Sequence, residues 1–258
     1  MTLISLPRLL RPILFLAALL AAGPALPAGT DEAKARALLD RTDDMHRGTS
    51  SHGTVTMHVK TARYDRTLTM EIWSRGEDAS LVVIRAPAKE AGTATLMVDE
   101  DIWNYLPKVD RTMKVPASMR SGAWMGSHFT NDDLVKESRM ADDYTFAITS
   151  RPDANPEKHW VIECIPKPDA AVVWGKVIVK IRGSDELPAE VTYWDEKGVL
   201  KRTMTFDDVR TMGGRTLPAR VRLVPSDKPD EFTEATYDGL EFDVAMPDST
   251  FTLQALKR

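Results

Sequence analysis

Three residues with the chemistry of a hydrolase lie within six positions of one another: Ser127, His128 and Asp132. A serine, a histidine and an acid can form a triad, in which the histidine accepts the serine proton and the acid orients the histidine. Sequence neighbours seldom provide this geometry, and the chain has no Gly-x-Ser-x-Gly motif. An esterase or lipase is therefore a minor alternative, and the sequence predicts that the protein is not an enzyme.

Possible metal ligands are equally sparse. Asp43, Asp44 and His46 lie at the end of an expected helix, where solvated charge is the simpler interpretation. No cysteine and histidine spacing matches a metal-binding motif. The single cysteine, Cys164, lies in the apolar segment WVIECIP and is expected to be a buried thiol. The sequence predicts no metal and no cofactor.

The segment 101–134 places large apolar side chains among serine and glycine residues, which do not favour the interior of a helix or a sheet. This composition is typical of a loop or short lid, and it indicates an apolar ligand beneath the segment. The alternative is a loop that closes the end of an ordinary core. Methionine suits the wall of an acyl-chain cavity because its side chain is flexible. The predicted cavity and lid residues are Met57, Met70, Ile72, Trp103, Tyr105, Met119, Trp124, Met125 and Phe129.

Basic residues flank the same segment, and we expect them to contact anionic head groups or an acidic partner. They are Lys108, Arg111, Lys114 and Arg120. The alternative is a solvated strand edge whose charges discourage edge pairing. Alternation along 101–106 puts Trp103 and Tyr105 on the face opposite Ile102 and Leu106, and the sequence leaves open which pair points inward.

The first 28 residues have the pattern of a signal peptide. Arg8 and Arg11 precede the apolar run 13–22, and a Gly-Pro-Ala segment leads to an expected cleavage site after Ala28. No cysteine lies near this site, so lipidation is not expected. These 28 residues contain two arginines and no acids, so cleavage changes the net charge from −4 to −6. The sequence predicts a periplasmic, acidic protein for which nucleic acid is not a partner.

The elements that hold the candidate residues follow from periodicity. The segment 30–47 predicts one substantial helix, with an apolar stripe at Ala35, Leu38 and Leu39 and a C-terminal Gly48. From 54–60 to 231–242, alternating apolar and polar residues recur between tight turns, which predicts about eleven antiparallel strands. A sheet of this length should curl around its apolar face. We expect a mainly β fold, a curved antiparallel sheet forming an incomplete β-barrel with a helical lid.

Several stretches resemble the outer-membrane lipoprotein-sorting proteins, in particular the LolA-like group of the LolA and LolB superfamily. They are DIWNYLP, WMGSHFTNDDL, WVIECIPKP, LPAEVTYWDEKGVLKRTMTFDDVRTMGGRTLPARVRL and MPDSTFTLQALKR. The resemblance covers essentially the whole chain after residue 28. The chain departs from the group at His128, where an aspartate is more usual.

The resemblance implies a periplasmic carrier or chaperone that binds acyl chains of a lipoprotein or lipid in an apolar barrel cavity. Residues 29–258 would form a single domain of this kind, and its partners could include an inner-membrane exporter complex and an outer-membrane acceptor. The alternative from another class is a non-carrier accessory subunit that docks on a membrane exporter, with its barrel filled by side chains.

Overall fold

A computed structural model describes residues 28–136, 140–153, 155, 157–170 and 172–257. The protein is mainly β, with one long helix, α1 (Ala28–Asp44), and a single sheet of 13 antiparallel strands. The predicted signal peptide lies, up to residue 27, outside the described residues. Within the described part of the chain, no helix is long and apolar enough to cross a membrane.

The sheet consists of two consecutive meanders, and its order is β6-β5-β4-β3-β2-β1-β13-β12-β11-β10-β9-β8-β7. The first meander comprises β1 (Ser50–Lys60), β2 (Asp65–Arg75), β3 (Ala79–Ala86), β4 (Ala94–Val98), β5 (Asp101–Leu106) and β6 (Arg111–Lys114). The second comprises β7 (Tyr144–Ser150), β8 (His159–Pro166), β9 (Lys176–Arg182), β10 (Pro188–Trp194), β11 (Leu200–Met212), β12 (Arg215–Pro225) and β13 (Phe232–Phe242).

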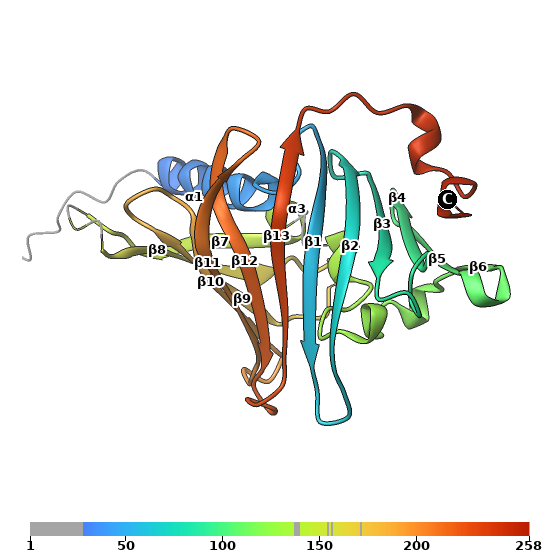
Figure 1. Cartoon of the computed structure of the whole chain (residues 1–258). Helices are drawn as coiled ribbons and strands as arrows, with labels where there is room; N and C mark the ends of the chain where they lie inside the picture. The colour runs from blue at the N-terminus through green and yellow to red at the C-terminus, as the bar shows by residue number, and fades with distance from the viewer. Residues whose placement is uncertain (1–27, 137–139, 154, 156, 171, 258) are drawn as a thin grey trace, which may run out of the picture.

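The sheet is curved, and its ends, β6 and β7, do not pair with each other, so the expected incomplete barrel is confirmed (Figure 1). The expected strand count is too low. The clearest omission is β6, whose four residues pair with β5 after a short turn, Pro107–Val109. β6 is short and mostly polar, so it carries too little alternation to be recognised from the sequence.

Helix α1 covers one half of the concave face. Ala35, Leu38 and Leu39 are fully buried and pack against side chains of β8 and β9, as the apolar stripe predicts. The helix ends at Asp44, and Gly48 follows in the left-handed conformation, with its N–H bonded to the Asp44 carbonyl at 3.0 Å. Cys164 lies in the same cluster, where burial raises the pKa of its thiol to about 12.

The other half of the concave face is covered by residues 117–136, which we call the lid segment. It contains the short helices η2 (Ala117–Met119), η3 (Trp124–Gly126) and α2 (Asp133–Lys136). Helix α3 (Met140–Asp143) leads into β7. The expected loop with little regular structure and a short following helix is confirmed.

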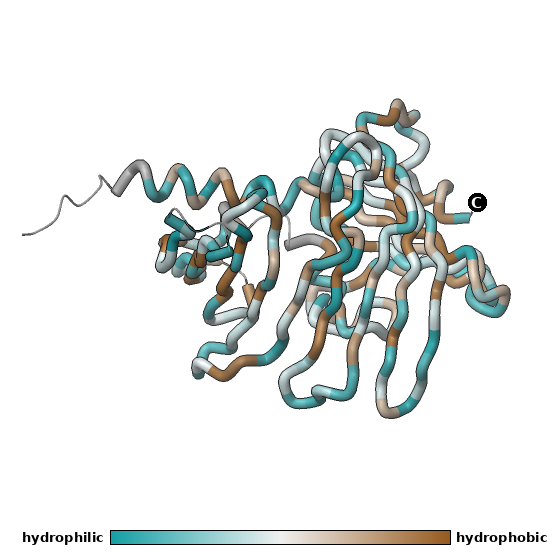
Figure 2. The backbone as a smooth tube through the Cα atoms, turned by 60° about the vertical axis from the view of Figure 1, so that its left-hand side comes forward, coloured by the Kyte–Doolittle hydropathy of each residue, from teal (hydrophilic) through white to brown (hydrophobic). Residues whose placement is uncertain are grey.

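The convex face of β3–β5 has its own cover, residues 243–257, which we call the C-terminal segment. It contains η5 (Asp248–Phe251) and η6 (Ala255–Lys257) and passes over these strands (Figure 1). Phe251 and Leu256 pack there against Leu81 and Leu96. Along the outer loops of the sheet, polar residues dominate, whereas apolar and polar residues alternate within the strands (Figure 2).

Candidate ligand cavity

A cavity of about 280 Å³ lies between the concave face of the sheet, the turn after α1 and the lid segment. Five predicted residues line it together: Met57, Met70, Ile72, Trp124 and Phe129. Its volume is near the lower end of the range for small-molecule sites, about 300–1,000 Å³. Most of the remaining wall is apolar and includes Val55, Val82, Leu134, Met140, Val191, Tyr193, Met204, Phe206, Val221, Ala235 and Tyr237.

Strand alternation puts the methionines on the cavity wall. In β1, Val55 and Met57 face inward, and Val55 pairs with Met70 of β2. Met70 in turn pairs with Ile84 of β3, which belongs to the same cluster. Three neighbouring strands therefore present one continuous apolar surface to the lid segment.

The lid segment is attached to this surface by hydrogen bonds. Trp124 is only 6% exposed, and its indole Nε1 donates to Thr95 Oγ1 at 3.1 Å. Thr95 Oγ1 donates in turn to Asn104 Oδ1 at 2.7 Å. The Trp124 backbone N–H also donates to the Phe129 carbonyl at 2.8 Å, which closes the loop between the two aromatic residues.

A buried ion pair joins the end of the lid segment to the second meander. The Asp133 carboxylate accepts two hydrogen bonds from the Arg202 guanidinium of β11, both at 2.7 Å, and the side chains are 8% and 6% exposed. The guanidinium carbon lies 4.1 Å from the ring centre of Tyr193 and 4.6 Å from that of Trp174. Asp133 also caps α2 by accepting the Thr130 N–H at 2.7 Å. The same carboxylate therefore stabilises the local structure of the lid segment and attaches the segment to β11.

The β1–β2 loop and the start of β2 hold the middle of the lid segment. The Tyr64 hydroxyl donates to the Gly126 carbonyl, and Arg66 Nη2 donates to the Met125 carbonyl. Met125 has a left-handed backbone with φ 47°, which is unusual for a residue with a side chain. It lines a second, more open cavity of about 530 Å³ with Glu90, so this predicted residue lies outside the first cavity.

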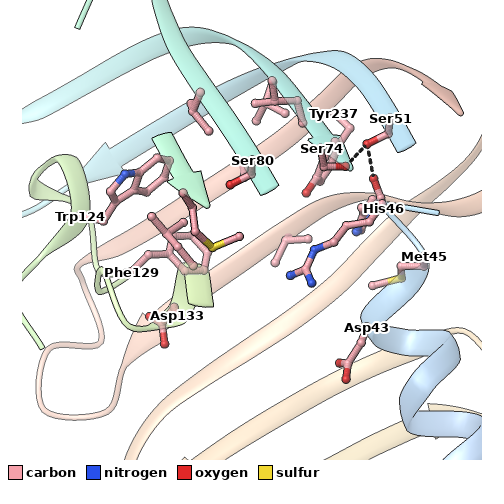
Figure 3. A pocket seen from close by; sticks show the side chains of 18 of the residues that line it. Asp43, Met45, His46, Ser51, Ser74, Ser80, Trp124, Phe129, Asp133 and Tyr237 are labelled. Carbon is pink, nitrogen blue, oxygen red and sulfur yellow. Dashed lines mark hydrogen bonds between the residues drawn. The ribbon is translucent and has the colours of Figure 1, made fainter. Parts of the chain in front are cut away.

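One end of the main cavity is polar, and sequence reasoning missed it. His46, Ser51 and Ser74 lie together at this end, where α1 leads into β1 (Figure 3). Arg47, which follows His46 in the chain, also lines the cavity. The sequence indicated solvated charge at His46, which is wrong. The His46 ring stacks on Tyr237, with ring centres 4.1 Å apart.

The environment of His46 keeps its ring neutral. Burial lowers the pKa of His46 from 6.5 to about 4, although the hydrogen bond from Nε2 to the Pro218 carbonyl, 2.8 Å long, opposes this shift. The nearby Arg47 lowers the pKa further. The sequence did hold one signal that His46 is buried: it lies directly after an amphipathic helix and before a half-buried strand.

Trp103 and Tyr105 do not line the cavity. β5 directs Ile102 towards the concave side, and the two aromatic residues pack on the convex face under the C-terminal segment. Met119 also lies outside the cavity, because it is 62% exposed on the outer side of the lid segment. A strand with apolar residues on both faces gives no signal of which face is concave.

The four basic residues lie near the β5–β6 end of the sheet, and they differ in their partners. Lys114 pairs with Asp101 at 2.6 Å, and Arg120 donates to the Glu100 carbonyl at 2.6 Å. Lys108 and Arg111 are exposed, and neither forms an ion pair with a residue in the described part of the chain. They therefore present free positive charge at the tip of this hairpin.

The possible hydrolase residues do not form a triad. Ser127 Oγ donates to the Trp124 carbonyl at 2.8 Å. His128 instead meets Thr233 Oγ1 through Nδ1 at 2.8 Å and Glu231 through Nε2 at 3.2 Å. Within the described residues, no three His, Cys, Asp or Glu side chains gather as they would around a metal ion.

The open, curved antiparallel sheet with its helix is a fold that this chain shares with a solved LolA superfamily protein. The chain belongs to a family described as an uncharacterized protein, whose model matches residues 76–258. The expected resemblance to LolA-like lipoprotein-sorting proteins is thereby confirmed. No curated protein matches the chain.

Three solved structures share the fold. A domain from Vibrio parahaemolyticus, named for outer membrane lipoprotein sorting, is 24% identical with a TM-score of 0.72, and the alignment covers 85% of this chain and 97% of that one. A DUF1329 family protein from Desulfovibrio piger is 20% identical with a TM-score of 0.78 and coverages of 88% and 99%. A LolA superfamily protein from Nitrosomonas europaea is 21% identical with a TM-score of 0.70 and coverages of 86% and 98%. The TM-scores show that the fold is shared.

Proposed function

We propose that the protein is a periplasmic carrier that binds acyl chains of a lipid or lipoprotein in the cavity under the lid segment. The observation that carries this proposal is the cavity itself, in which Met57, Met70, Ile72, Trp124 and Phe129 come together. No catalytic step is needed, because each buried methylene contributes about 0.8 kcal/mol. A short stretch of ordered chain therefore gives useful affinity.

Ligand entry requires the lid segment to move, and its attachment supports such a movement. The segment is held by hydrogen bonds at Trp124 and Met125, by the Asp133–Arg202 ion pair, and by packing of its apolar side chains against β1–β3. When the segment swings away, water can replace its polar partners, and an acyl chain can replace its apolar side chains at the cavity wall. Leu134 and Phe129 would then leave the cavity wall and expose it.

The β5–β6 hairpin is the proposed contact site for a donor or an acceptor. Lys108 and Arg111 lie there beside the exposed apolar side chains of Leu106, Val109 and Met113. Lys114 and Arg120 lie nearby and are partly neutralised by acids. Free cations next to exposed apolar groups suit an anionic membrane surface or an acidic partner protein.

The same hairpin favours the second candidate function, an accessory subunit that docks on a membrane exporter without carrying a ligand. The two candidates differ in what the cavity does. A carrier exchanges the cavity contents, whereas a docking subunit uses only its surface. The experiment must therefore address the cavity.

The test is native mass spectrometry of protein purified from the periplasm, followed by organic extraction and by uptake of a fluorescent fatty acid. The double variant Trp124→Ala/Phe129→Ala removes two aromatic residues from the cavity wall. The matched control is Trp103→Ala, which removes an aromatic residue from the convex face. We expect a co-purifying lipid in the wild type and the control, and its loss in the folded double variant.

The contrary result is a clean apo mass together with no fatty acid uptake by the wild type. That result would reject the carrier and favour the docking subunit. Esterase activity that disappears in Ser127→Ala would reject the non-catalytic role.

A further inference from the structure

The main cavity has chemically different ends. Trp124 and Phe129 lie at one end, whereas Ser51, Ser74 and His46 lie at the other (Figure 3). β1–β3 explain this separation, because Ser51 pairs with Ser74, and Ser74 pairs with Ser80, where the ends of these three strands lie side by side. The cavity therefore matches a molecule with an apolar chain and a polar head.

Arg47 is the charged group of the polar end that is available to a ligand. It lines the cavity and is only partly exposed, and no residue in the described part of the chain forms a hydrogen bond or an ion pair with its guanidinium. The two acids that line the cavity are engaged within the protein: Asp133 with Arg202, and Asp43 through its own interaction. A partly desolvated guanidinium favours an anion strongly.

The other polar groups at this end differ in whether they can still form a hydrogen bond to a ligand head group. Ser51 Oγ donates to the His46 carbonyl at 3.1 Å and lies 2.7 Å from Ser74 Oγ, so these two hydroxyls satisfy each other. His46 Nε2 contacts the Pro218 carbonyl. The Ser80 hydroxyl makes no hydrogen bond to the described residues and lines the same cavity, so it remains a free donor.

Stabilisation of the helix end does not account for Arg47. Arg47 lies three residues beyond the last residue of α1, and the effect of the helix dipole falls off within the last turn. Arg41 occupies that last turn and pairs with Glu186 at 3.1 Å. The helix therefore already has a cation in the favourable place.

We propose that the cavity binds an amphiphile with an anionic head group, a carboxylate or a phosphate, which Arg47 and Ser80 hold while the hydrocarbon chain runs towards Trp124 and Phe129. This inference rests on the proposed carrier function and narrows its ligand. The cavity should then recognise both the charged head group and the hydrocarbon chain of its ligand. A free anionic lipid should therefore bind more tightly than an uncharged lipid with a chain of equal length.

The test compares a fluorescent long-chain fatty acid with its methyl ester, which has the same chain and no charge. Titrations use the whole mature protein. We expect the wild type to bind the acid roughly tenfold or more tightly than the ester, as a charge-assisted hydrogen bond implies. Arg47→Gln should weaken binding of the acid much more than binding of the ester and so remove this preference, whereas Arg47→Lys should keep part of it.

Arg63→Gln is the matched control, because Arg63 is an exposed arginine in the loop between β1 and β2. It should retain the preference of the wild type. Competition with an alkyl phosphate and with inorganic phosphate then distinguishes a lipid head group from a free ion. Competition by the alkyl phosphate alone indicates a lipid, and competition by inorganic phosphate at similar concentration indicates a site for the free ion and overturns the amphiphile.

The two proposals fail in different ways. Equal binding of acid and ester by the wild type, or an unchanged preference in Arg47→Gln, would overturn the role of Arg47 while the carrier function stands. Binding of neither ligand by the wild type rejects both the carrier function and this inference.

Discussion

Strands β3–β5 are covered on both faces, and the two covers differ in how they are attached. On the concave side, Trp124 of the lid segment packs on the sheet, the Trp124–Thr95 hydrogen bond and the buried Asp133–Arg202 pair add polar attachment, and a cavity remains beneath the segment. On the convex side, Phe251 and Leu256 of the C-terminal segment pack directly into an apolar cluster.

This difference indicates which cover can open. Lifting the C-terminal segment would expose a closely packed apolar surface, and the lost burial would have no replacement. Lifting the lid segment exposes a wall that already borders empty volume, and in the proposed carrier an acyl chain replaces the side chains that leave. The concave side is therefore suited to exchange, and the convex side to stability.

The largest expected loss of stability follows removal of the ion pair that attaches the lid segment to β11. Asp133→Ala removes the carboxylate that accepts two hydrogen bonds from the buried Arg202 guanidinium, which should lower the free energy of unfolding by about 3–5 kcal/mol. Chemical denaturation measures this loss. Restoring most of the stability with the double variant Asp133→Ala/Arg202→Met would confirm the cause, and a loss below about 1 kcal/mol would contradict a buried pair.

Truncation of the apolar cover should come next. Phe251→Ala removes a side chain that is nearly fully buried against β3 and β4, and we expect a loss of about 3 kcal/mol in unfolding free energy. Fatty acid uptake by the folded variant should equal that of the wild type, because Phe251 lies on the face opposite the cavity. If the fully folded variant takes up less fatty acid than the wild type, the C-terminal segment also affects the cavity, which would contradict the separate roles of the two covers.

Acid should lower the free energy of unfolding because His46, beside the cavity, is buried as a neutral ring. Its folded-state pKa, about 4, lies below its usual value of 6.5, so the unfolded chain binds the proton more readily. The contribution of the neutral ring is complete above about pH 6.5 and is lost as the pH falls to 4, by up to about 3 kcal/mol. His46→Gln should lose less stability over this interval when denaturation is measured at each pH, and an equal pH dependence would reject this role.

The smallest effect is expected at the polar contacts of the C-terminal segment. Arg75 pairs with Asp248 at 2.6 Å, but both side chains are exposed. Asp248→Asn should therefore change the free energy of unfolding by less than about 1 kcal/mol. The same denaturation experiment measures it, and a change comparable to that of Phe251→Ala would show that polar contacts hold both covers.

The sequence predicted the sheet well because alternation records burial directly. Val55, Met57 and Val59 alternate with polar residues, and all three are buried in β1. It could not identify which face of β5 is concave, since Trp103 and Ile102 are both suited to packing. A continuous apolar run, Leu81–Ile84, was the available signal that β3 is covered on both faces.

The candidate site was predicted in part for a similar reason. Met57, Met70, Trp124 and Phe129 were identified by size and position, and they meet in the cavity. The polar end was missed because Arg47 and the neighbouring acids look like a solvated helix end. Only the packing of the β1 and β2 strand ends against the turn after α1 brings Arg47 to the cavity.

The pairing of β1 with β13 has a consequence for how the molecule is made. Ser51 pairs with Phe242, so the centre of the sheet joins the beginning of the domain to its end. Each meander grows from local hairpins, which form quickly, but this central seam closes only when the whole chain is present. A chain that crosses a membrane unfolded would hold two open sheet edges until its last strand emerges, and this interval is when it most needs protection from aggregation.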